Sequence, residues 1–146
     1  MEKNGLKLLN RIYQDAQIGM QSIDKVLKKL EDENMKKLFK KQFESYNNFS
    51  QKCEEIAINE NVELKDNSMF KKLKQTAMIY ISLWTNKMPR HIVEMMITGT
   101  VMGVIDAIKA EKDLASNHEG VNALVVEFKK MQEDFYEKLK KLLSKV

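Results

Sequence analysis

Apolar residues recur near the start of the chain at steps that alternate between four and three positions. An α-helix places residues with this spacing on one side, so the pattern predicts a helix over 6–30 with a continuous apolar stripe. The same alternation predicts helices over 35–59, 68–85 and 116–144, and long helices with one apolar side indicate a helical bundle. The stripes consist of Leu9, Tyr13, Ala16, Met20, Ile23, Leu27 and Leu30, then Met35, Phe39, Gln42, Tyr46, Phe49, Cys53 and Ile56, then Phe70, Leu73, Ala77, Tyr80 and Trp84, and finally Val121, Leu124, Phe128, Met131, Phe135, Leu139 and Leu142.

The connections between these segments indicate how the helices pair. The polar turn 31–34 joins the first two, and so short a connection makes them antiparallel neighbours. About 30 residues separate the second helix from another that follows Pro89, enough to cross the bundle and to carry the short helix over 68–85. A proline disfavours helix at the residue before it, so the chain is either broken or kinked at Pro89. Ser116 and Glu119 match a capping box, which predicts Ser116 as the N-cap of the last helix.

The composition agrees with a single all-α domain over residues 1–146. One proline and five glycines are few for a β fold with many turns. The single cysteine, Cys53, excludes an internal disulfide and a multi-cysteine metal site, and its place on a stripe indicates a core residue. Only Arg11 and Arg90 among the 25 basic residues are arginines. Lysines that alternate with acids predict a solvated surface rather than a nucleic-acid interface.

The segment after Pro89 is the most apolar part of the chain. Between Ile92 and Ile108 the only formal charges are Glu94 and Asp106. A transmembrane helix needs roughly 20 mostly apolar residues, so this shorter segment predicts a helix covered on more than one side rather than a membrane span. Either the helix over 68–85 or a second copy of the chain would supply the cover, and the latter predicts a homodimer. The expected interface residues are Trp84, Ile92, Met96, Ile97, Val101 and Met102.

Several short segments in both halves of the chain share a pattern with known proteins. They are Asp15-Ala16-Gln17-Ile18-Gly19-Met20, Met35-Lys36-Lys37-Leu38-Phe39, Leu83-Trp84, Ile92-Val93-Glu94-Met95-Met96, Gly99 and Gly103. Together they resemble bacterial ferritin-like domains of unassigned function, and the resemblance covers most of the chain. It implies a ferritin-like antiparallel four-helix bundle with a long crossover that carries an extra short helix.

A ferritin-like bundle raises the question of a di-metal site. Such sites take one Glu from each of two helices and a Glu-x-x-His pair from each of the other two. Glu44 and Glu127 lie on suitable helices, but neither is followed by the histidine, and Asp24 and Asp106 stand where lone carboxylates are expected. The sequence therefore predicts no metal, no cofactor and no catalytic residues. The alternative interpretation is a degenerate metal-binding or iron-handling protein that uses these four carboxylates.

The functional expectation is consequently an interaction or structural protein rather than an enzyme. His91 is expected at a helix start and His118 in a turn, so neither is expected at the middle of the bundle. The first residues contain no long apolar run and no cleavage site. They predict a protein without a signal peptide that resides in the cytoplasm.

Overall fold

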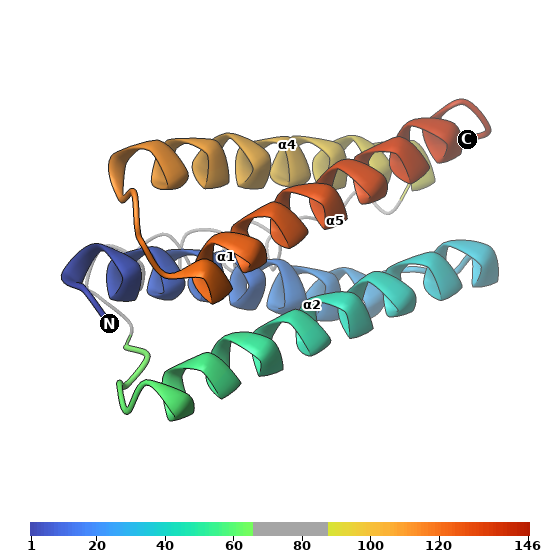
Figure 1. Cartoon of the computed structure of the whole chain (residues 1–146). Coiled ribbons are helices and arrows are strands. Elements are labelled where there is room, and N and C mark those ends of the chain that lie inside the picture. The colour runs from blue at the N-terminus through green and yellow to red at the C-terminus, as the bar shows by residue number, and fades with distance from the viewer. Residues whose placement is uncertain (66–87) are drawn as a thin grey trace.

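The protein is all-α in a computed structural model that describes residues 1–65 and 88–146. Within these ranges the chain forms four helices and no strands (Figure 1). The helices are α1 (Lys3–Leu27), α2 (Glu33–Asn59), α4 (Pro89–Asp113) and α5 (Glu119–Leu143). The predicted four-helix bundle and all-α class are confirmed. The helix expected over 68–85, with the predicted interface residue Trp84, lies outside the described residues.

The helices form two antiparallel hairpins, α1 with α2 and α4 with α5. One end of the bundle holds the start of α1, the end of α2, the end of α4 and the start of α5 (Figure 1). Contacts at this end join the hairpins: Asn4 Nδ2 donates to the Ala115 carbonyl at 3.3 Å, and His118 Nε2 lies 2.6 Å from Glu60 Oε1. Helices α1 and α5 therefore run in one direction, and α2 and α4 run in the other.

The apolar stripes meet in the interior, as the spacing predicts. Phe39 packs edge-on against Phe135 with ring centroids 6.0 Å apart, and Phe49 packs against Phe128 at 5.1 Å. All four rings are buried. These pairs join α2 to α5 and so connect the two hairpins. Aromatic pairs of this kind add about 0.5–1.5 kcal/mol to the stabilisation that burial provides.

The helix boundaries differ from the expected ones in places. Helix α1 begins at Lys3 and ends at Leu27, three residues earlier at each end than the stripe indicated, because Leu30 completes the stripe from the turn that follows. Helix α2 begins at Glu33, and the Asp32 carboxylate accepts a bond from the Met35 amide at 2.8 Å. Helix α4 begins at Pro89 after an extended Met88, so the helix does not continue through the proline from its N-terminal side.

The predicted N-cap of α5 is wrong. The helix begins at Glu119, and its N-cap is His118, whose ring Nδ1 accepts a bond from the Val121 amide at 3.2 Å. Ser116 lies outside the helix and binds the N-cap residue instead, because its hydroxyl oxygen accepts a bond from the His118 amide at 3.0 Å. The contact of His118 with Glu60 fixes the ring where it reaches the first turn of the helix. Glu60, the residue that follows α2 and is distant in sequence, thus helps to position the residue that caps α5.

Replacing His118 with alanine is expected to lower the free energy of unfolding by about 1 kcal/mol, because α5 loses its N-cap. The matched control is His91→Ala, since His91 is exposed in the first turn of α4. Chemical denaturation of the two variants checks this expectation. Equal small losses in both would contradict a capping role for His118.

Candidate functional site

The four carboxylates of the alternative metal site do not come together. Asp24 is exposed and pairs with Lys28 at 3.8 Å, whereas Glu44 is exposed on α2. Among the described residues, no group of three His, Cys, Asp or Glu side chains is placed to hold a metal ion. Glu127 pairs with Lys52 at 2.5 Å, so a lysine already occupies the carboxylate that α5 was expected to contribute.

Asp106, the fourth of these carboxylates, belongs to a different arrangement between α4 and α1. Its Oδ2 accepts a bond from Arg11 Nε at 2.8 Å, and its Oδ1 accepts a second bond from Arg11 Nη2. Such a two-point contact between a guanidinium and a carboxylate is strong and directional. The Asp106 side chain is 23% exposed and the Arg11 side chain 43%, so the carboxylate is largely covered whereas the guanidinium remains in contact with solvent.

Asp15 lies one helical turn after Arg11 and completes this arrangement. Its Oδ2 atom is buried and has no hydrogen-bond partner among the residues that the structure describes. Burial, together with contact with the Asp106 carboxylate, raises the pKa of Asp15 to about 9, although Arg11 acts in the opposite direction. Burial also acts to raise the pKa of Asp106, but hydrogen bonds from Arg11 and Asp15 outweigh it and lower that pKa. We call Asp15 and Asp106 the acid pair, and Arg11 is its arginine.

A second polar layer crosses the centre of the bundle. The Tyr46 hydroxyl on α2 donates to Gln132 Oε1 on α5 at 2.5 Å, and both residues are buried. Gly19 on α1 lies against the Tyr46 ring, and Gly103 on α4 lies against the Gln132 amide. Either glycine would collide with its neighbour if it had a Cβ. Burial raises the pKa of Tyr46 to about 12, so its hydroxyl remains a neutral donor.

Most of this polar centre was not predicted from the sequence. Gln42 is the one amide in its predicted stripe, and its Nε2 is buried without a hydrogen-bond partner among the described residues. Gln132 lies four positions after Phe128 and three before Phe135, so helical spacing alone places it on the core side. Asp15 lies on the same side of its helix as Ile12 and Gly19, at steps of three and four. Helical spacing of polar residues was therefore the available signal.

The expected interface residues of α4 occupy different environments. Ile92 and Met96 are buried in the core, Ile97 and Val101 are half-buried, and Met102 is 65% exposed. Ile105 and Ile108 follow Met102 at steps of three residues, and their side chains are 47% and 52% exposed. We call Met102, Ile105 and Ile108 the α4 row.

Helix α4 also has the length and composition to cross a membrane, and it is the one such helix in the described ranges. Buried core helices of soluble proteins share these properties. In this structure α4 packs against both α5 and α1. Its length and hydropathy are therefore weak evidence for a membrane span.

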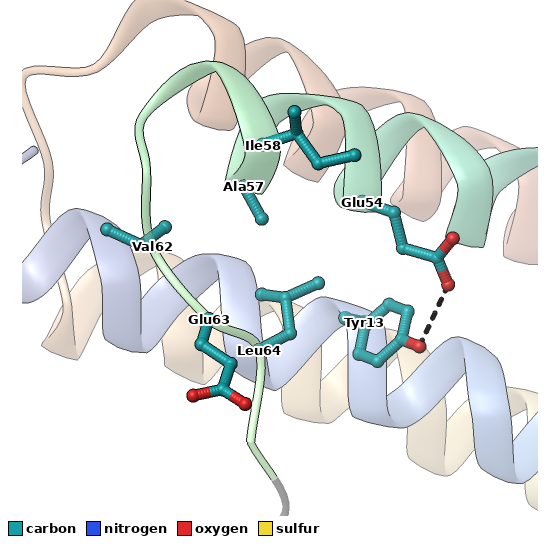
Figure 2. Close-up of a pocket in the computed structure, with 7 residues that line it drawn as sticks. All are labelled: Tyr13, Glu54, Ala57, Ile58, Val62, Glu63 and Leu64. Atoms are coloured by element: carbon teal, nitrogen blue, oxygen red, sulfur yellow. Dashed lines mark hydrogen bonds between the residues drawn. The ribbon is translucent and has the colours of Figure 1, made fainter.

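A shallow cavity lies at the end of the α1–α2 hairpin (Figure 2). It is lined by Tyr13, Glu54, Ala57, Ile58, Val62, Glu63 and Leu64 and has a volume of about 330 Å³. The Tyr13 hydroxyl donates to Glu54 Oε1 at 3.0 Å on one side of it. Two bonds tie the end of the loop to α1, one from Gln14 Nε2 to the Lys65 carbonyl at 2.7 Å and one from the Lys65 amide to Asn10 Oδ1 at 3.0 Å. The cavity combines an apolar floor with two carboxylates.

Comparison with protein-family models found no match, and comparison with curated proteins found no similar sequence. The function must therefore be argued from the residues themselves. Three features are available for that argument: the α4 row, the acid pair with its arginine, and the shallow cavity.

Proposed function

We propose that this chain is a non-catalytic helical bundle of the ferritin-like type that acts as an interaction or structural protein in the cytoplasm and self-associates through α4. The observation that carries the proposal is the α4 row. Its three large apolar side chains are each between 47% and 65% exposed on one helix. Contiguous exposed apolar surface on a soluble domain commonly marks a site of association.

A second copy of the chain is the partner that this surface favours. A two-fold dimer buries the same patch on both subunits, so a single apolar row provides both halves of the interface. Specific interfaces bury about 800 Å² per partner, so the row and its half-buried neighbours Ile97 and Val101 would form the apolar centre of a wider contact. Insertion of α4 into a membrane would instead remove Ile92 and Met96 from the core and uncover the helices against which they pack. Self-association leaves the bundle intact.

The course of the chain supports the ferritin-like part of the proposal. Helices α2 and α4 run in the same direction (Figure 1), so the connection between them has to join opposite ends of the bundle. One long crossover between two antiparallel hairpins is the connection that ferritin-like bundles use. In our proposal the short helix over 68–85 belongs to this crossover.

The ion pairs of the candidate carboxylates favour a non-catalytic role. Asp106 is held by Arg11, and Glu127 is held by Lys52. A metal would have to displace these cations and draw together side chains that belong to separate regions of the surface. The proposal therefore assigns both carboxylates to the joining of helices.

The experiment is the mass of the protein in solution, measured by light scattering over a range of micromolar concentrations. We expect a dimer for the natural chain and a monomer with unchanged helicity for Ile105→Glu, because a buried charge without a partner opposes association. The matched control is Val126→Glu, since Val126 is 59% exposed on α5 and lies outside the α4 row.

Two results would overturn the proposal. One is a natural chain that stays monomeric at every concentration. The other is a dimer that survives Ile105→Glu but is lost in Val126→Glu, which would place the interface on α5. Co-sedimentation of the natural chain with lipid vesicles, abolished by Ile105→Glu, would assign the row to a membrane surface instead.

A further inference from the structure

The contact between the two hairpins contains a buried acid, Asp15, that has no part in the proposed self-association. We propose that Asp15 and Asp106 share one proton, that this proton helps to hold α1 against α4, and that its loss weakens the contact between the hairpins. The acid pair would thus make the closed bundle sensitive to alkaline pH. The inference is independent of the oligomeric state.

The positions of Arg11, Asp15 and Asp106 point to a proton between the two carboxyl groups. Asp15 lies one turn after Arg11, whose guanidinium binds Asp106, and Asp106 acts to raise the pKa of Asp15. Two carboxylates placed around one arginine cannot both be ionised at low energetic cost. Arg11 engages both oxygens of Asp106. The negative charge therefore belongs on Asp106, and the proton on Asp15, whose Oδ2 is buried without a hydrogen-bond partner among the described residues.

The charges around the pair support the same assignment. From α1, Arg11 faces both acids, and from α4, Lys109 interacts with Asp106. From α2, the Tyr46 hydroxyl lies close enough to interact with Asp15, and its partner on α5, Gln132, carries no charge. Arg11 can neutralise one carboxylate at this contact. A second negative charge on Asp15 would be buried with no cation of its own among the described residues.

The position of the pair gives its proton a structural consequence. The helices within each hairpin pack closely along their length, whereas α1 and α4 share a smaller contact. The acid pair and its arginine lie in this smaller contact, where they join residues 95 positions apart in sequence. Ionisation of Asp15 would place like charges on the two helices, and repulsion would act on the weaker packing.

The direction of the pH dependence follows from linkage. The ordinary pKa of an aspartate is 3.8, whereas that of Asp15 in the folded chain is about 9. Between these values the folded chain holds one proton more than the unfolded chain, so stability falls as pH rises through the interval. The unfolding equilibrium constant should increase by about tenfold per pH unit from this group, and the effect should level off above pH 9. Asp106, whose pKa is lowered, acts only in more acidic solution.

The test compares Asp15→Asn with Asp24→Asn in chemical denaturation between about pH 6 and pH 8. Asparagine keeps a donor for Asp106 and carries no titratable proton. In the natural chain Asp15 should make the unfolding constant rise about tenfold per pH unit, and we expect this contribution to be absent in Asp15→Asn. Asp24→Asn should retain the natural dependence, because Asp24 is an exposed aspartate of the same helix. Equal pH dependence in the natural chain and Asp15→Asn would overturn the proposal.

Infrared spectroscopy of the folded protein provides a readout that stability alone does not. A protonated carboxyl group has a carbonyl stretch distinct from that of a carboxylate, and isotope-labelled aspartate identifies its source. At neutral pH we expect this band in the natural chain and in Asp24→Asn, and its loss in Asp15→Asn. Absence of the band from the natural chain would overturn the proposal even if Asp15→Asn failed to fold.

Discussion

Replacing Phe128 with alanine is expected to lower the free energy of unfolding by about 3–5 kcal/mol. The Phe128 ring is fully buried and packs against Phe49 at 5.1 Å, where α5 meets α2. Removing the ring loses both its burial and this contact, and it leaves a cavity that rigid helix backbones cannot close. Denaturation by urea, followed by circular dichroism, measures the change.

The matched control for this prediction is Val126→Ala on the same helix. Val126 is 59% exposed, so its truncation should change the stability by less than about 0.5 kcal/mol. A loss below about 1 kcal/mol for Phe128→Ala would show that α5 presents a different side to the core. It would also contradict the aromatic contact between the hairpins.

Gly19→Ala and Gly99→Ala are expected to change stability in opposite directions. A Cβ at Gly19 would lie 2.6 Å from Cζ of the buried Tyr46 ring, whereas no atom of the described residues lies within 4 Å of the Cβ position at Gly99. Alanine is favoured over glycine in a helix interior by about 1 kcal/mol. At Gly99 that gain should appear in full. At Gly19 it should be exceeded by an overpacking cost of about 1–3 kcal/mol.

A double variant separates overpacking from other causes. If the Tyr46 ring is what Gly19→Ala meets, the same substitution made in a Tyr46→Leu background should cost less than in the natural chain. Chemical denaturation of the four proteins in this cycle gives the coupling directly. Stabilisation by Gly19→Ala comparable to that of Gly99→Ala would contradict the close approach of α1 to the Tyr46 ring.

The helices and the side of each helix that faces the core could be predicted from the sequence because their signals are local. The four-and-three spacing of Phe39, Phe49, Phe128 and Phe135 defines one side of each helix, whatever the rest of the chain does. The short polar turn before α2 likewise makes α1 and α2 antiparallel neighbours. Both features are properties of adjacent residues, and the structure confirms them.

The candidate site could not be predicted in the same way, because its partners are distant in sequence. The chain contains 21 acidic and 25 basic residues, and spacing along a helix does not say which of them meet. Asp106 was grouped with Asp24, Glu44 and Glu127, yet it pairs with Arg11 from another helix. Helical spacing places its neighbour Asp15 towards the interior, but that spacing does not indicate that Asp15 lies beside an acid of α4.

Periodicity thus determines which side of each helix is buried, since 3.6 residues make one turn in any α-helix. It does not determine the rotation and offset at which two hairpins meet. Those depend on how side chains from all four helices fit together, as Gly19 fits the Tyr46 ring and Gly103 the Gln132 amide. That fit places Asp15 against Asp106 and lets His118, rather than Ser116, cap α5. Pairings that rest on such three-dimensional fit, with energies set by burial and charge, arise only when the chain is folded.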